Sequence, residues 1–122
     1  MAQAPNVESP PSISDSYVIA QSRPYTFDLT PTADGYCVSF VQKNGFQNYH
    51  GNANQWIKYI NSKVPRVGSA VVESYGTIGH LALVTSITKA GIEVYEQNFV
   101  GRWIVSHRIL NTYELIGYIN PH

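Results

Sequence analysis

The chain has 122 residues, enough for one domain whose hydrophobic core needs no disulfide or metal to stabilise it. Eight basic residues balance eight acidic ones, which argues against a nucleic acid or an anionic membrane surface as the partner. The single cysteine excludes an intramolecular disulfide, and no apolar run approaches the length of a membrane span. We therefore expect a monomeric single domain without nucleic-acid or membrane partners.

The chain begins with an irregular segment. Residues 1–15 are rich in proline and serine and lack periodicity, which predicts a flexible leader. The triplet Ala2-Gln3-Ala4 resembles a signal-peptidase cleavage motif, but the basic and apolar stretches of a complete signal peptide do not precede it. Residues 16–122 are then expected to form the single domain.

A first helix is predicted over residues 35–44. Three of its residues share one face at i, i+3 and i+4 spacing, namely Cys37, Phe40 and Val41. Asn44-Gly45 then has the sequence of a helix C-cap. This pattern places Cys37 near the start of the helix.

The following residues predict a second helix and then a sheet. The second helix covers residues 52–63, with Asn52 as its N-cap and Pro65 beyond its end. The hydrophobic period then becomes that of strands. Five strands are predicted: Ser69–Glu73, His80–Ile87, Ile92–Gln97, Trp103–Ile109 and Leu115–Ile119. Helices followed by a run of strands indicate an α+β domain, in which the N-terminal helices pack on an antiparallel sheet.

One cysteine, one histidine and one carboxylate are spaced as nucleophilic catalysis requires. Cys37 lies at a predicted helix start, His80 begins one predicted strand, and Glu96 lies on the next strand. The unpaired N–H groups and the positive dipole end of a helix N-terminus favour a thiolate, and an imidazolium beside it favours the thiolate further. This arrangement fits a cysteine nucleophile with a base and an orienting group, and it predicts hydrolysis of an amide bond.

Several short segments occur in a recognisable order from about residue 33 to the C-terminus. They are Gly35-Tyr36-Cys37, Gly51-Asn52-Ala53-Asn54-Gln55-Trp56, Pro65-Arg66-Val67-Gly68-Ser69-Ala70, Gly79-His80-Leu81-Ala82-Leu83-Val84, Tyr95-Glu96-Gln97-Asn98 and Gly117-Tyr118-Ile119-Asn120-Pro121. Together they resemble the CHAP family, the cysteine- and histidine-dependent amidohydrolases/peptidases of the papain-like superfamily. The resemblance implies a papain-like fold.

The resemblance also implies a role for each site residue. Cys37 would attack the carbonyl carbon, and its backbone N–H would be one oxyanion donor. His80 would protonate the departing amine and later activate the water that releases the acyl group. Glu96 is the candidate that holds His80 in one tautomer. Asn98, two residues further along the strand and therefore on the same face, is expected to help orient His80 or to bind substrate.

The substrate implied by the resemblance is bacterial peptidoglycan. The cut would fall within the stem or cross-bridge peptides, as by an endopeptidase, or between the glycan and the first amino acid, as by an N-acetylmuramoyl-L-alanine amidase. Such an endolysin-like enzyme would act outside the cell or on the wall after secretion or phage delivery. Targeting would come from the groove, from a partner, or from a larger assembly such as a phage particle or secretion machine.

Two other functions remain open. One is a catalytically silent module that binds wall peptides, and the other is a cysteine amidase that acts on a small soluble amide conjugate. No cofactor or metal is expected. No pair of histidines has metal-ligand spacing with Cys37, and Asp28 and Asp34 do not form the calcium loop that some CHAP domains carry ahead of the cysteine.

Overall fold

The computed structural model describes residues 26–121 of the chain. The predicted leader over residues 1–15 lies outside this range. The described residues form one α-helix, two 3-10 helices and five strands, in this order: α2 (Cys37–Gln42), η1 (Ala53–Tyr59), β1 (Ala70–Glu73), β2 (His80–Thr88), β3 (Gly91–Gln97), β4 (Val105–Ile109), η2 (Thr112–Glu114) and β5 (Leu115–Ile119).

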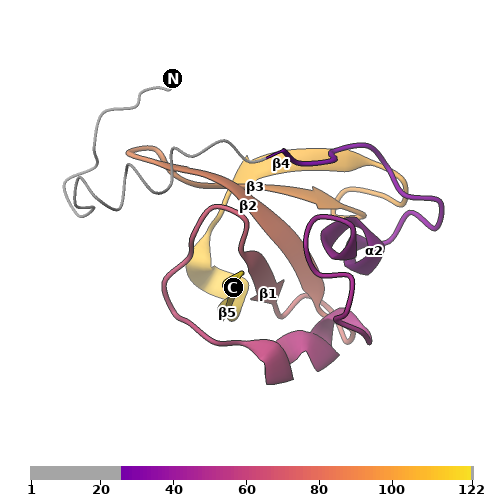
Figure 1. Ribbon diagram of the computed structural model, residues 1–122, viewed down its shortest axis with the longest axis horizontal. Coiled ribbons are helices and arrows are strands. Elements are labelled where there is room, and N and C mark those ends of the chain that lie inside the picture. The colour runs from indigo at the N-terminus through magenta and orange to yellow at the C-terminus, as the bar shows by residue number, and fades with distance from the viewer. Residues whose placement is uncertain (1–25, 122) are drawn as a thin grey trace.

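The five strands form one sheet in the order β4-β3-β2-β1-β5, and every neighbouring pair is antiparallel (Figure 1). β2 and β3 form a hairpin in which Thr88 pairs with Gly91. At the opposite end of β2, His80 pairs with Glu73 of β1. The first residue of β2 therefore lies beside the last residue of β1.

α2 and η1 pack on one face of this sheet. α2 contacts β2 and β3, and η1 contacts β1, β2 and β5. Trp56 of η1 is fully buried and donates its indole N–H to the carbonyl oxygen of Gly51 at 3.2 Å. The main core lies between the helices and the sheet and consists of these residues: Phe40, Val41, Phe46, Ala53, Trp56, Ala70, Val72, Leu81, Leu83 and Ile119.

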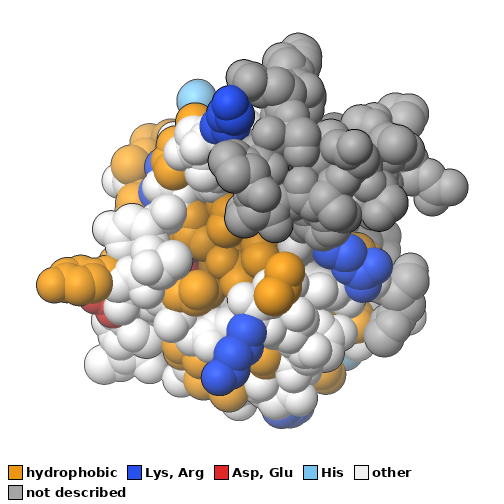
Figure 2. Space-filling model, turned by 90° about the vertical axis from the view of Figure 1, so that its left-hand side faces the viewer, with side chains coloured by type: hydrophobic (Ala, Val, Ile, Leu, Met, Phe, Trp, Pro, Cys, Tyr) orange, Lys and Arg blue, Asp and Glu red, His pale blue; other side chains and the backbone are white. Residues whose placement is uncertain are grey.

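The other face of the sheet carries a second, smaller hydrophobic cluster. Its buried members are Val71, Ala82, Val84, Val94, Leu110 and Tyr118. Hydrophobic side chains also gather on the side of the molecule that faces away from α2 (Figure 2). Side chains alternate along a strand, so Glu73, His80 and Glu96 lie on the same sheet face as this second cluster.

The predicted antiparallel sheet is confirmed, and the strand bounds differ from the prediction by at most two residues. The largest difference is at β4, which begins at Val105 instead of Trp103. Trp103 has φ of 68°, a left-handed conformation that does not occur in an extended strand.

The helical part of the α+β prediction is only partly confirmed. α2 starts at Cys37 instead of Gly35, because Gly35 has φ of 75° and cannot be part of a right-handed helix. The second helix is a 3-10 helix that ends at Tyr59. Beyond it, Ser62 forms a β-bridge with Tyr118, and this pairing takes the backbone groups that a longer helix would use. The fold is therefore mostly sheet, with less helix than a papain-like domain implies.

None of the helices among the described residues is long and apolar enough to cross a membrane.

Candidate active site

Cys37 is the first residue of α2 and is half-buried. The residue before it, Tyr36, is extended with φ of −99° and ψ of 156°, so the chain turns into the helix directly at the cysteine. No acidic residue lies in the first turn of α2. Cys37 therefore belongs to the first turn of the helix, whose backbone N–H groups have no partner within the helix.

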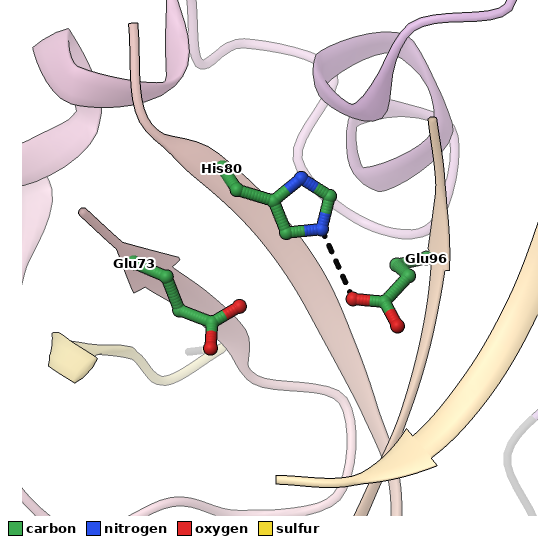
Figure 3. Close-up of side chains that lie close together, drawn as sticks. All are labelled: Glu73, His80 and Glu96. Carbon is green, nitrogen blue, oxygen red and sulfur yellow. Dashed lines mark hydrogen bonds and ion pairs between the residues drawn. The ribbon is translucent and has the colours of Figure 1, made fainter. Parts of the chain in front are cut away.

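His80 and Glu96 form a buried hydrogen-bonded pair. The Nε2 atom of His80 lies 3.0 Å from Oε1 of Glu96, and the two residues are 4% and 0% exposed (Figure 3). Because the carboxylate can only accept, Nε2 carries the proton in this pair. Glu96 thus selects the tautomer in which Nδ1 is free to interact with another group.

Cys37 is the other partner of the imidazole. Burial lowers the pKa of His80, but hydrogen bonds with the Cys37 thiol and the Glu96 carboxylate outweigh it and raise that pKa to about 9. Because Nε2 is bonded to Glu96, the contact with the thiol falls to Nδ1. The structure therefore brings three of the sequence-predicted residues together in the order cysteine, histidine, carboxylate.

A pocket of about 470 Å³ lies beside the thiol and the imidazole. It is lined by Asp34, Tyr36, Cys37, Val38, Ser39, Gly51, Asn52, Ala53, Ile78, Gly79, His80 and Asn98. These residues come from the loop before α2, the first turn of α2, the start of η1, the end of the β1–β2 loop, the start of β2 and the residue that follows β3. A ligand in this pocket would be in contact with both reactive side chains.

Asn98 lines the pocket, but it does so from a loop and not from the continued strand that the sequence predicted. The strand does not continue to this residue, because β3 ends at Gln97 and Asn98 has φ of 66°. Its backbone N–H donates to the carbonyl oxygen of Ile104 at 3.2 Å, across the β3–β4 loop. Asn98 lines the pocket with Cys37 and His80, whereas Glu96 holds the imidazole from behind.

Two further charged residues complete the buried site, and the sequence analysis missed them. Arg108 of β4 donates from Nε to Oε2 of Glu96 at 2.9 Å, and from Nη2 to Oε1 of the same carboxylate at 2.9 Å. The same Nη2 atom donates to Oε1 of Glu73 at 2.5 Å. The sequence of β3 did contain a signal for them. Glu96 shares a strand face with the apolar Val94, which predicts that Glu96 is buried, and a buried carboxylate requires a cation from a neighbouring strand.

Glu73, His80 and Glu96 place three possible metal-ligand atoms within 4.8 Å of one another. The guanidinium of Arg108 is already hydrogen-bonded to both carboxylates and supplies a positive charge there. Burial lowers the pKa of Arg108, but the hydrogen bonds with Glu96 and Glu73 outweigh it and raise that pKa. These side chains therefore fit an arginine-centred ion network better than a metal centre.

Gln97 fixes the loop that leads into the nucleophilic helix. Its side chain is fully buried, and its Oε1 accepts from the backbone N–H of Thr32 at 2.9 Å. Its Nε2 donates to the Thr32 hydroxyl at 2.7 Å and to the carbonyl oxygen of Tyr36 at 2.9 Å. The loop before Cys37 is thus tied to the end of β3, next to Glu96.

The β3–β4 loop holds the same segment from the outside. Arg102 donates from Nε to the carbonyl oxygen of Asp34 at 2.8 Å, and Trp103 donates its indole N–H to that of Ala33 at 3.0 Å. The Arg102 guanidinium also lies 4.2 Å from the ring centres of both Tyr36 and Trp103. These contacts join the pocket wall to the loop that carries Asn98.

In this small α+β domain, a cysteine and a histidine line one pocket, and a buried carboxylate is hydrogen-bonded to the histidine. This arrangement of side chains is typical of the class of cysteine-dependent hydrolases. A family model described as the CHAP domain matches residues 28–98, which is more than half of the chain, and the protein belongs to this family. No curated protein matches the chain. Membership indicates peptidoglycan hydrolase or amidase activity in general, and it is typical of proteins that act on the cell wall.

Proposed function

We propose that this protein is a cysteine-dependent peptidoglycan hydrolase that cleaves an amide bond through a thioester on Cys37. The observation that carries the proposal is the position of His80, whose Nε2 is hydrogen-bonded to the buried Glu96 while its imidazole lines the same pocket as the Cys37 thiol. A base between a nucleophile and an orienting group is the arrangement that acyl transfer requires.

The first half of the reaction forms the thioester. The Cys37 thiolate attacks the carbonyl carbon of the substrate, a C–S bond forms, and the carbonyl electrons move to oxygen. The backbone N–H of Cys37 is the proposed donor to this oxyanion. When the tetrahedral species collapses, the C–N bond breaks, and the proton held by His80 passes to the departing amine.

The second half releases the acyl group. His80, now neutral, takes a proton from a water molecule, which attacks the thioester carbon. The C–S bond then breaks, the carboxylic acid leaves, and the thiolate is restored beside an imidazolium. Throughout both halves Glu96 accepts from Nε2, so Nδ1 is the atom that exchanges protons with the substrate and the water.

Asn98 is proposed to bind the substrate and not to orient the imidazole. Asn98 lines the pocket together with Cys37, whereas the Nε2 atom of His80 is already hydrogen-bonded to Glu96. An amide side chain offers both a donor and an acceptor, which suits the peptide groups of a wall stem or cross-bridge peptide.

The proposed substrate bond lies in the stem or cross-bridge peptide, or between the glycan and its first amino acid. The enzyme would act outside the cell or on the wall, after secretion or delivery by a phage. Targeting would come from the groove, from a partner or from a larger assembly.

Digestion of purified peptidoglycan by the wild type and by Cys37→Ala tests the proposal. We expect soluble fragments from the wild type alone, and mass spectrometry of their new termini identifies the bond as muramoyl-alanine or peptide. Circular dichroism establishes that both proteins are folded. Equal release by a folded Cys37→Ala variant contradicts the mechanism. Absence of release by both contradicts the substrate and favours a wall-binding module or an amidase of small amide conjugates.

A further inference from the structure

Four strands contribute one charged side chain each to a continuous buried chain of contacts. His80 of β2 bonds to Glu96 of β3, Glu96 bonds to Arg108 of β4, and Arg108 bonds to Glu73 of β1. The side chains of both glutamates are fully buried, and that of Arg108 is 18% exposed. These contacts join residues of four neighbouring strands, β4, β3, β2 and β1, and so span three strand pairings of the sheet.

Burying these charged side chains is unfavourable in free energy, and a stable fold does not require it. Each buried carboxylate loses its hydration, and apolar side chains of similar volume stabilise a core as well or better. Glu73 in addition leaves its Oε2 atom buried without a hydrogen-bond partner among the described residues. These unfavourable buried charges are connected to Glu96, the hydrogen-bond partner of His80. We therefore expect their role to lie in the site and not in stability.

The contacts of Arg108 define the position of Glu96 closely. The guanidinium bonds to both oxygens of the Glu96 carboxylate, so the plane of the carboxylate is fixed as well as its place. Phe99 lies over the guanidinium, with 4.2 Å between Cζ and the ring centre, and its ring also lies beside His80. The Nη2 atom of Arg108, which bonds to Glu96, also bonds to Glu73.

We propose that Arg108 and Glu73 are positioning residues of the catalytic site: Arg108 orients the carboxylate of Glu96 toward His80, and Glu73 holds Arg108 and restores a net negative charge behind the imidazole. The inference rests on the proposed function for its catalytic meaning. It extends the proposed site from the pocket side chains to a buried layer behind them.

The charges around the imidazole determine what Glu73 contributes. The titratable and charged groups packed near His80 are Cys37 of α2, Glu73 of β1, Tyr75 of the β1–β2 loop, Glu96 of β3 and Arg108 of β4. Asp34, from the loop before α2, lines the same pocket. With Glu73 ionised, the buried layer of two glutamates and one arginine carries one net negative charge. Without it the layer is neutral, and the imidazolium loses stabilisation.

The test is the pH dependence of Cys37 alkylation by iodoacetamide in the full chain. This readout needs no substrate, and Cys37 is the only thiol in the sequence. The wild-type rate is expected to change near pH 9, where His80 loses its proton. In Glu73→Gln, which keeps the side-chain shape, this upper inflection should move to lower pH by on the order of one unit.

Glu93→Gln is the matched control. Glu93 lies on β3, the strand of Glu96, but its carboxylate is paired with the exposed His107 and lies outside the buried layer. This variant removes one negative charge and should leave the upper inflection in place. A folded Glu73→Gln variant with the wild-type profile, or an equal shift in Glu93→Gln, overturns the inference.

Arg108→Lys provides a second test if Glu73→Gln does not fold. It keeps the positive charge, but one ammonium group cannot reproduce the two bonds to Glu96 together with the bond to Glu73. We expect the upper inflection to fall here too, because a loosened Glu96 stabilises the imidazolium less. An unchanged profile in folded Arg108→Lys overturns the inference. If the wild type digests no peptidoglycan, the proposed function fails, while the alkylation profiles still decide the role of Arg108 and Glu73.

Discussion

The hydrogen bonds of the site meet at the imidazole of His80. Its Nε2 atom is committed to Glu96, which leaves Nδ1 for the thiol and for the substrate. Burial lowers the pKa of His80, but its interactions with Cys37 and the Glu96 carboxylate outweigh this effect and raise that pKa to about 9, which stabilises the imidazolium. The proton needed by the departing amine is therefore present throughout the neutral range.

Glu96→Gln tests this account of His80. Loss of the negative charge lowers the pKa of His80, so the alkaline limb of the pH–rate profile should move below its wild-type position near pH 9. The neutral amide can also present its NH₂ group to Nε2 and favour the wrong tautomer, so the rate should fall by roughly 10²-fold or more. Initial rates of peptidoglycan solubilisation from pH 5 to 10 measure both effects. An unshifted alkaline limb contradicts the role of Glu96.

Asn98→Gly separates substrate binding from orientation of the imidazole. Glycine accepts the left-handed backbone at this position, where φ is 66°, so the substitution removes the side chain without adding backbone strain. If Asn98 binds substrate, KM should rise about 10-fold while kcat changes little. Kinetics on a soluble wall fragment measure the two constants. A fall in kcat with unchanged KM would instead assign Asn98 to the chemistry of His80.

The loop before α2 and the β3–β4 loop behave as one structural element. Gln97, Arg102 and Trp103 all bond to backbone carbonyls between Ala33 and Tyr36. These bonds fix the direction from which the chain enters α2, and so the position of the thiol. A helix of six residues has little intrinsic stability, so its placement depends on such tertiary contacts.

Gly35→Ala tests this coupling. A Cβ atom at Gly35 would lie 2.8 Å from side-chain atoms of both Arg102 and Trp103, and φ of 75° adds strain. We expect the free energy of unfolding to fall by about 1–3 kcal/mol and activity to fall further than stability explains. Urea denaturation and peptidoglycan digestion measure the two quantities.

Gly76→Ala is the control for backbone strain alone. Gly76 has φ of 61°, and a Cβ atom there would have no described neighbour within 4 Å. It should show the stability cost without the additional loss of activity. Equal losses of activity in the two variants would mean that the two loops are not coupled to the site.

The strands were predictable and the helices only in part, for a physical reason. Strand bounds depend on side-chain alternation and on turn residues, both of which are local in sequence. Helix bounds were decided by distant partners. Ser62 pairs with Tyr118 and stops a helix that the local pattern predicts to continue, and Gly35 takes a left-handed conformation under the side chains of the β3–β4 loop.

For the molecule as a whole, the site residues with local sequence motifs could be predicted, whereas those that meet only through the strand order of the sheet could not. Cys37, His80 and Glu96 have recognisable local surroundings, and the structure brings them together. Their roles in catalysis stay predictions. Glu73 and Arg108 were missed because they meet only through the strand order β4-β3-β2-β1 and are 35 positions apart in the chain. No periodicity or short motif specifies that pairing.

The same network links the stability of the molecule to pH when its arginine is removed. Arg108→Met would leave the carboxylates of Glu73 and Glu96 buried without their cation, which costs about 3–5 kcal/mol at neutral pH. Burial already raises the pKa of Glu73 above its ordinary value, even with Arg108 in place, and loss of the arginine raises it further. The folded variant therefore binds a proton that the unfolded chain has released.

This excess proton sets the sign of the pH dependence. A carboxyl group whose pKa is raised on folding destabilises the folded state as pH rises above its unfolded value, here 4.5. Arg108→Met should consequently be closest to wild-type stability near pH 5 and lose stability steadily toward pH 8. Urea unfolding at each pH measures this slope. Arg102→Met, which removes a solvent-exposed arginine that also stacks on aromatic rings, should show no such slope relative to the wild type. A pH-independent deficit in Arg108→Met would contradict this account, because it would mean that loss of Arg108 changes the pKa of neither carboxylate in the folded state.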